Sequence, residues 1–328
     1  MTAREAIEYL QKMMNEVTIG QEHIVDRLIM GLLADGNMLI EGLPGLAKTR
    51  VVRSMSNFIE SKFSRIQFTP DLRPSDVMGE ERSYIENGNT VRRFHKGAIF
   101  GNIILADEIN RAPAKVQSAM LEAMEEKQVT VSGVTYKLPE LFIVMATQNP
   151  VEQDGTYPLS EAQKDRFLMH IKIDYVDMES EFKMVKMVKE EKHHEKKQYR
   201  KISQELIFTA RDEIAELKIS DEIGRYMIDL VYATRFPMRY RRQLAVMIER
   251  GVSPRGSLAL SKCAQTHAWL KGKSEVDVED VQSVIQDVFH HRLTLTDHAL
   301  TNNRTNADII QIILENVSVP QRSQPQRS

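Results

Sequence analysis

The chain has 328 residues, of which 42% are hydrophobic and 27% are charged; this length predicts two domains, and this composition is typical of a folded protein with a sizeable core. Its formal net charge of −2 gives no basic excess that would favour nucleic acid or an acidic membrane as a partner. The single cysteine, Cys263, excludes an internal disulfide framework, and no stretch resembles a signal peptide or a membrane span, so we expect a cytoplasmic protein without membrane insertion.

Two helices are predicted at the N-terminal end, separated by a short apolar break at residues 17–20. Apolar side chains recur at helical spacing over residues 3–16, and again at Ile24, Val25, Leu28, Ile29 and Leu32. Periodicity favours a helix–helix turn for the break, which ends at Gly20. The alternative is a backbone wall that contacts an adenine ring.

A phosphate-binding loop is predicted at residues 42–49, which read Gly-Leu-Pro-Gly-Leu-Ala-Lys-Thr between an apolar run and a helical pattern at 51–59. Small residues let backbone N–H groups approach a phosphate chain, and the helix N-terminus adds a positive dipole end. Lys48 is expected to reach the β- and γ-phosphates, and the Thr49 hydroxyl to bind Mg²⁺. Ala47 stands where the strict motif has glycine, and it fits only if its φ is negative. The residues expected to contact the nucleotide here are Gly42, Pro44, Gly45, Leu46, Ala47, Lys48, Thr49 and Arg50.

Several segments after this loop have clear local signals. Residues 63–69 alternate with period 2 and predict a strand, whereas residues 70–76 are rich in turn formers. Asn87-Gly88 predicts a tight hairpin turn within residues 84–91, because both residues accept positive φ. A second hairpin is predicted over residues 129–136.

Two carboxylates follow a buried strand predicted at residues 102–106. A continuous apolar run of this kind indicates a strand buried on both faces of a parallel sheet, and ligands of such sheets bind at the carboxyl ends of the strands. Asp107 is therefore expected in the Mg²⁺ shell, and Glu108 where it can polarise a water for attack on the γ-phosphate. An acidic helix cap is the alternative for the pair alone, but the upstream phosphate loop favours the catalytic interpretation.

A second buried strand, predicted at residues 141–147, ends just before Asn149. This amide is expected at the same sheet edge, where it can orient a water or contact a phosphate. Turn formation before Pro150 explains the residue nearly as well. Residues 160–167 then predict a helix that leads into a strand at 169–173, and the spacing alone gives Arg166 only a surface salt bridge.

The C-terminal half shows only helical patterns beyond residue 203, at roughly 203–217, 220–235, 254–271, 277–291 and 305–317. Asp277 is a predicted N-cap. Arg255 falls in the first turn of a helix capped by Ser253, where a cation is disfavoured unless an anion lies nearby. The basic cluster at residues 239–242 is ascribed to an exposed helix face in preference to RNA or DNA contact. His193 and His194, in the charged segment 178–201, are ascribed to a solvated helix end in preference to a metal site.

Taken together, these motifs resemble the MoxR family of AAA+ ATPases. The most specific matches are residues 42–49, similar to Walker A; 105–113, similar to Walker B at Asp107 and Glu108; and 67–72, 146–150, 161–167 and 253–255. The family implies an α/β fold, in which a P-loop AAA+ core has a parallel sheet between helices and a C-terminal all-α lid domain follows. We expect the core over residues 1–196, the lid over 197–318 and a disordered tail over 319–328.

The resemblance also implies roles that spacing does not give. Asn149 matches sensor 1, Arg255 matches sensor 2 on the lid, and Arg166 matches the arginine finger that enters the nucleotide site of a neighbouring subunit. The break at 17–20 matches the adenine-contacting segment, which adds Ile19 and Gly20 to the nucleotide site.

The activity implied is ATP hydrolysis with ATP and Mg²⁺ as cofactors, by a homo-oligomeric ring, a hexamer, that acts as a chaperone-like remodeller or maturation factor. Family members often act with partners that carry a von Willebrand factor A domain. A trans arginine itself predicts a ring, since a heterologous interface that closes forms one. The alternatives are a small-molecule kinase or GTPase, a nucleotide-gated scaffold, and a nucleic-acid motor. No guanine-specifying Asn-Lys-x-Asp motif occurs, and the net charge of −2 weakens the motor.

Overall fold

The computed structural model describes residues 1–43, 46, 48–87, 89–149, 157–191 and 199–320. The chain divides into two compact units, one of residues 1–167 and 171–210, and one of residues 168–170 and the chain from 211 on. We call them the core unit and the lid unit. The boundary expected at 196/197 and most of the expected tail lie outside the described residues.

The core unit is built on a five-stranded sheet with strand order β2-β5-β8-β1-β9. Neighbours β1–β8, β8–β5 and β5–β2 all pair in parallel, which confirms the expected parallel sheet. Strands β5 and β8 are buried along their whole length, as continuous apolar runs predict. The strands are β1 (Met38–Gly42), β2 (Phe63–Gln67), β5 (Ile103–Asp107), β8 (Ile143–Gln148) and β9 (Met169–Ile173).

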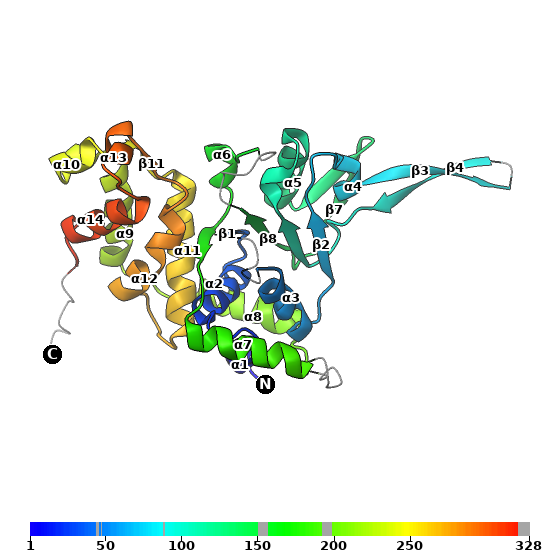
Figure 1. Ribbon diagram of the computed structural model, residues 1–328, viewed down its shortest axis with the longest axis horizontal. Coiled ribbons are helices and arrows are strands. Elements are labelled where there is room, and N and C mark those ends of the chain that lie inside the picture. The colour runs from blue at the N-terminus through cyan, green and yellow to red at the C-terminus, as the bar shows by residue number, and fades with distance from the viewer. Residues whose placement is uncertain (44–45, 47, 88, 150–156, 192–198, 321–328) are drawn as a thin grey trace. The chain divides into compact units, whose positions relative to one another are not determined.

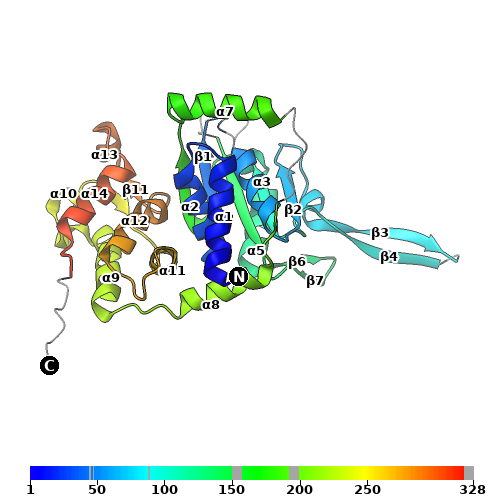
Figure 2. The same ribbon diagram turned by 90° about the horizontal axis from the view of Figure 1, so that it is seen from below.

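Helices cover both faces of this sheet (Figure 1). One face carries α1 (Ala3–Val17), α2 (Glu22–Leu33) and α3 (Lys48–Phe58), and Figure 2 shows α1 lying across it. The other face carries α5 (Ala114–Glu126). Successive side chains of β5 point to opposite faces of the sheet, because Cβ atoms alternate along a strand.

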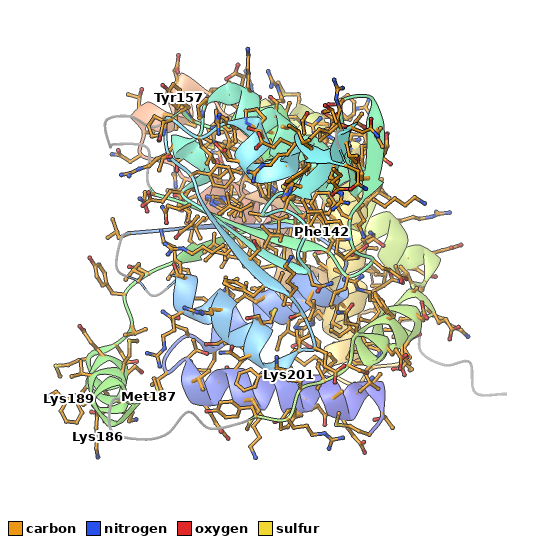
Figure 3. All side chains as sticks on the ribbon, turned by 90° about the vertical axis from the view of Figure 1, so that its right-hand side faces the viewer. Phe142, Tyr157, Lys186, Met187, Lys189 and Lys201 are labelled. Carbon is orange, nitrogen blue, oxygen red and sulfur yellow. The ribbon has the colours of Figure 1, made fainter. Side chains whose placement is uncertain are left out.

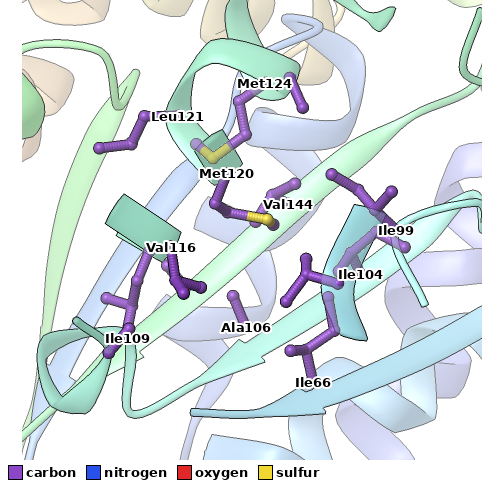
Figure 4. Close-up of a cluster of buried hydrophobic side chains, with 14 of the residues drawn as sticks. Ile66, Ile99, Ile104, Ala106, Ile109, Val116, Met120, Leu121, Met124 and Val144 are labelled. Carbon is purple, nitrogen blue, oxygen red and sulfur yellow. The ribbon is translucent and has the colours of Figure 1, made fainter. Parts of the chain in front are cut away.

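The core under α5 shows how the sequence pattern becomes packing (Figure 4). Ile104 and Ala106 of β5 lie against Val116 and Met120 of α5, all at most 1% exposed. Burial of each of the larger side chains here, isoleucine, valine and methionine, stabilises the fold by about 1.5–3 kcal/mol. This packing fixes α5, and with it the chain segment between Asp107 and the helix.

Two hairpins extend from the core unit, and both were predicted. The first, β3 (Gly79–Glu86) with β4 (Asn89–Lys96), is longer than the 84–91 segment expected. The second is β6 (Gln128–Val131) with β7 (Val134–Lys137). Phe94 of β4 stacks on Tyr136 of β7 with ring centroids 3.9 Å apart, which ties the two hairpins together.

Two local predictions in the core unit need correction. The segment expected to be a turn at 70–76 contains a short helix, α4 (Pro74–Met78), because proline starts it and Asp76 accepts the Arg73 N–H at 2.9 Å. The helix predicted at 160–167 is only α6 (Glu161–Lys164). Beyond it the N–H groups of Arg166 and Phe167 bond three residues back, and the buried Phe167 turns the chain toward β9.

The charged segment forms α7 (Met178–Glu191) at the periphery of the core unit, where Lys186 and Lys189 point outward (Figure 3). His193 and His194 lie outside the described residues. Helix α8 (Gln204–Ala215) contains the division between the two units. Among the residues that the structure describes, no helix combines the length and apolar character that crossing a membrane requires.

The lid unit is helical, as expected. Its longer helices are α9 (Asp221–Arg235), α11 (Pro254–Leu270), α12 (Val278–Phe289) and α14 (Asn306–Asn316). Asp277 is the N-cap of α12, as predicted, and accepts the N–H of Asp280 at 3.2 Å. Short helices η2 (Pro237–Arg239), α10 (Arg242–Ala245) and α13 (Asp297–Thr301) also lie in this unit.

The expectation of an all-α lid is wrong in one detail. Strands β10 (Ile248–Arg250) and β11 (Thr294–Leu295) pair as an antiparallel ladder. Strands this short carry no period-2 signal, and their pairing joins residues far apart in the chain.

The basic cluster at 239–242, expected on an exposed helix face, does not lie on one helix, because it spans the end of η2 and the start of α10.

Candidate nucleotide site

The predicted phosphate loop connects β1 to α3, as the strand–loop–helix pattern requires. Gly42 ends β1 so close to β9 that an added Cβ would lie 2.8 Å from the Ile173 carbonyl oxygen. Pro44, Gly45 and Ala47 lie outside the described residues, so the negative φ expected for Ala47 stays a prediction. Thr49 and Arg50 follow Lys48 in the first turn of α3 and are half-buried.

Lys48 is held at the carboxyl edge of the sheet. Its ammonium donates to the Gly42 carbonyl oxygen at 2.6 Å, to Asn149 Oδ1 at 3.0 Å and to the Gln148 carbonyl oxygen at 3.3 Å. Burial lowers the pKa of Lys48 below its ordinary value, although the negative charges of Asp107, Glu108 and Glu41 act in the opposite direction. The lysine therefore lies between the ends of β1 and β8, beside both predicted carboxylates.

Asp107 ends β5 and is only 7% exposed. The Thr147 hydroxyl donates to Asp107 Oδ1 at 2.7 Å. Arg65 of β2 donates to Asp107 Oδ2 from Nη2 at 2.6 Å and from Nε at 3.1 Å. Both carboxylate oxygens thus accept hydrogen bonds, and the negative charge has an arginine partner.

Glu108 leaves the strand through a left-handed backbone conformation, with φ +58°. This conformation is uncommon outside glycine and asparagine and persists where the surroundings fix it. Here the Glu108 N–H donates to Thr147 Oγ1 at 2.9 Å. Its carboxylate accepts from Asn149 Nδ2 at 3.0 Å on Oε1, and Arg111 Nε lies 3.1 Å from Oε2.

Asn149 joins the lysine to Glu108. Its Oδ1 accepts from Lys48 and its Nδ2 donates to Glu108, so one amide spans the gap between the cation and the carboxylate. The Asn149 carbonyl oxygen also accepts from Asn110 Nδ2 at 3.3 Å. The structure therefore brings together Lys48, Asp107, Glu108 and Asn149, as the sheet-edge argument predicted.

The turn at residues 17–20 connects α1 to α2, as periodicity favoured. Gly20 has φ +74°, and an added Cβ would lie 2.6 Å from Ser180 Cβ, so only glycine fits. The next residue, Gln21, donates from Nε2 to the Leu46 carbonyl oxygen at 3.3 Å. The turn that contains the half-buried Ile19 is therefore tied to the phosphate loop, which agrees with the adenine interpretation as well.

Of the two predicted arginines, Arg166 lies in the core unit and Arg255 in the lid unit. Arg166 donates from Nε to Glu125 Oε2 of α5 at 2.8 Å and from Nη1 to the Ala162 carbonyl oxygen at 2.9 Å. Arg255 is exposed in the first turn of α11, in the lid unit. Ser253 holds the N-cap position of that helix but makes no capping hydrogen bond with its side chain.

Mg²⁺ suits the chemistry of this edge. The expected ligands, the Thr49 hydroxyl and the Asp107 carboxylate, are hard oxygen donors of the kind this ion prefers. The described part of the chain contains no group of His, Cys, Asp and Glu large enough to hold a metal ion alone. Mg²⁺ typically takes one or two protein oxygens and completes its shell with waters and nucleotide phosphates.

Sequence reasoning missed Arg65, Thr147 and Arg111. Register gives the signal for the first, since Gln67 pairs with Asp107 across β2 and β5 and Arg65 lies two residues before Gln67 on the same face. Thr147 ends the apolar run of β8 as a fully buried hydroxyl. A polar residue at the end of a buried strand, beside a carboxylate pair, is a detectable pattern.

Comparison with known proteins identifies the family of this chain. Residues 37–169 match the family described as "ATPase family associated with various cellular activities (AAA)", and residues 242–313 match the AAA lid domain. The fold and these matches define an ATPase of the AAA+ class. Chaperone MoxR1 of Mycobacterium tuberculosis is 39% identical over 93% of this chain and 80% of its own length.

Two further relatives cover nearly the whole chain. The uncharacterized protein YeaC of Bacillus subtilis is 40% identical over 97% of this chain and 95% of its own. The crystal structure of a candidate ATPase from Cytophaga hutchinsonii matches with a TM-score of 0.90 at 40% identity, covering 97% of this chain and 96% of that one. The chain belongs to the MoxR family of AAA+ ATPases.

Proposed function

We propose that this protein hydrolyses ATP with Mg²⁺ and uses the cycle to remodel or mature a partner protein. The observation that carries the proposal is the Asn149 amide, which bonds the Lys48 ammonium on one side and the Glu108 carboxylate on the other. Two consecutive hydrogen bonds thus connect a phosphate-binding cation, a water-orienting amide and a general base. Beside it lies Asp107, whose carboxylate is suited to a metal ion.

In this mechanism each residue has a definite task. Lys48 exchanges its carbonyl acceptors for β- and γ-phosphate oxygens, and Thr49 with Asp107 holds Mg²⁺, which supplies charge neutralisation on the phosphates. Glu108 accepts a proton from the attacking water, while the Asn149 amide orients that water. The hydrogen bond from Asn149 and the ion pair with Arg111 hold the Glu108 carboxylate in one direction.

We propose that Arg166 acts in trans, within a homohexameric ring, on the γ-phosphate of a neighbouring copy. In its own chain Arg166 is paired with Glu125, and both side chains are about one-third exposed. Solvent weakens such a pair, so it can open when another subunit docks. Arg255 is proposed as the arginine by which a lid over residues 197–318 contacts nucleotide held on a core over residues 1–196.

The proposed partner is a protein client, and the von Willebrand factor A domain proteins of the family are the first candidates. The relative called Chaperone MoxR1 supports a chaperone-like role. Nothing in the charge of the chain favours a nucleic-acid substrate, since the formal net charge is −2.

Phosphate release from ATP by the purified full chain tests the activity. Glu108→Gln should retain ATP binding and lose hydrolysis, because it removes the base and keeps the side chain's shape. The same variant, loaded with ATP, should capture the client, whereas Lys48→Ala should not. Hydrolysis at the wild-type rate by Glu108→Gln would remove Glu108 from the base role, and a wild-type protein without ATPase activity would overturn the proposal.

A further inference from the structure

Arg65 forms an ion pair with Asp107. In the proposed mechanism, the same carboxylate binds Mg²⁺. We propose that Arg65 is an internal counterion that holds Asp107 in the nucleotide-free protein and competes with Mg²⁺ for it. The inference rests on the proposed function, because it concerns the metal that accompanies ATP. It adds a residue that sets how much Mg²⁺ the site requires.

The geometry of the pair supports a strong contact. Two nitrogens of one guanidinium donate to a single oxygen, Asp107 Oδ2, at 2.6 and 3.1 Å. The other oxygen accepts the Thr147 hydroxyl at 2.7 Å. Charge-assisted hydrogen bonds, such as those from Arg65, are the strong ones. A metal ion that takes Asp107 as a ligand must therefore displace the guanidinium from Oδ2 or weaken its bonds.

The arginine is placed so that it can leave. The Arg65 side chain is 49% exposed, whereas the Asp107 side chain is 10% exposed, so solvent can receive the guanidinium while the carboxylate stays in the site. Gln67 Oε1 already accepts from Arg65 Nη2 at 2.5 Å and would remain an acceptor for the guanidinium once Asp107 binds a metal ion. A divalent cation at Asp107 also repels the guanidinium at short range. Arg65 and Mg²⁺ are thus alternative partners of one carboxylate.

The test compares the full chain with Arg65→Met, which keeps an unbranched side chain of similar length without the charge. Binding of a fluorescent ADP is measured against Mg²⁺ concentration, with chelator as the zero point. The Mg²⁺ concentration at half-maximal binding should fall roughly fivefold in Arg65→Met, because about that factor corresponds to a half-exposed ion pair. Arg82→Met is the matched control; it breaks the exposed 2.9 Å pair with Glu80 on β3 and should leave the curve unchanged.

Each outcome separates the inference from the proposed function. If the wild-type protein binds no nucleotide at any Mg²⁺ concentration, the proposed function fails. If the wild-type protein binds nucleotide normally and Arg65→Met needs as much Mg²⁺ or more, the proposed competition between Arg65 and Mg²⁺ is overturned. A larger Mg²⁺ requirement would mean that Arg65 orients Asp107 for the metal. Should Arg65→Met not fold, Arg65→Lys keeps a cation without the two-nitrogen contact. Its curve should shift in the same direction by about twofold, and an unshifted curve would overturn the inference.

Discussion

The Thr147 hydroxyl connects the Asp107 carboxylate to the backbone of Glu108, since it donates to Asp107 Oδ1 at 2.7 Å and accepts the Glu108 N–H at 2.9 Å. Its side chain is fully buried. One hydroxyl therefore fixes the carboxylate proposed to bind the metal and the turn that carries the proposed general base.

Thr147→Val keeps the shape of the side chain and removes the hydroxyl. The Glu108 N–H and one Asp107 oxygen then lose a partner, so the free energy of unfolding should fall by about 1–3 kcal/mol. ATP turnover should fall roughly 10- to 100-fold, as is usual when groups that orient metal ligands are lost. Thr147→Ser should retain most of both. Chemical denaturation and phosphate release measure the two effects, and a fully active Thr147→Val would show that the hydroxyl orients nothing.

Lys48 predicts a pH dependence of stability. Because burial lowers its pKa, the folded protein binds this proton less readily than the unfolded chain. The unfolding free energy should therefore rise with pH between the lowered pKa and the ordinary value of 10.5. Below the lowered pKa both states are protonated, and the folded state carries the full cost of the buried charge.

The measurement is urea unfolding of nucleotide-free protein at increasing pH, with Lys48→Met as reference. Subtracting the variant removes the titration of other lysines and of tyrosines. A positive slope confined to the wild-type protein is expected as the pH approaches 10.5. Parallel curves for both proteins would contradict it.

Arg166→Ala should abolish turnover without preventing ATP binding, since it removes the arginine proposed to act on the neighbouring site. Adding Lys48→Ala subunits, which bind nucleotide poorly but retain Arg166, should restore part of the activity. Glu125→Gln is the matched control: it breaks the same 2.8 Å pair and leaves the arginine, so turnover should persist and stability should change by at most about 1 kcal/mol. Absence of any rescue at ring-forming concentrations would argue against trans action.

Gly20→Ala should lower the unfolding free energy by about 1–3 kcal/mol and weaken nucleotide binding. Alanine is strained at φ +74°, and its Cβ would meet Ser180 at 2.6 Å. Gly224→Ala is the contrast, because this helical glycine has no atom within 4 Å of an added Cβ. That change should stabilise the protein by about 1 kcal/mol. Thermal unfolding and fluorescent-nucleotide titration test both, and an unaffected Gly20→Ala would remove the turn from the site.

The sheet and its catalytic edge could be predicted because both depend on local patterns. Continuous apolar runs identified β5 and β8, and each run ends in the polar residues that face the phosphate loop. Parallel pairing then brings Asp107, Glu108 and Asn149 to one edge, whatever the loops between them do.

The parts that could not be predicted depend on contacts between distant residues. The β10–β11 ladder pairs Ile248 with Leu295, and neither strand is long enough to show a period. Arg166 pairs with Glu125 of α5, 41 residues earlier in the chain. Arg65 reaches Asp107 only because β2 lies next to β5, an order that no local pattern fixes.

The Asn149 side chain has one orientation in the site, with its oxygen toward Lys48 and its nitrogen toward Glu108. An amide has an acceptor end and a donor end, and here the acceptor faces the cation while the donor faces the anion. A carboxylate at this position would keep the first bond and repel Glu108, and a cationic side chain would do the reverse. Only a neutral group with both ends can face opposite charges at once. The choice of asparagine is therefore dictated by the sign of its two neighbours and not by its size.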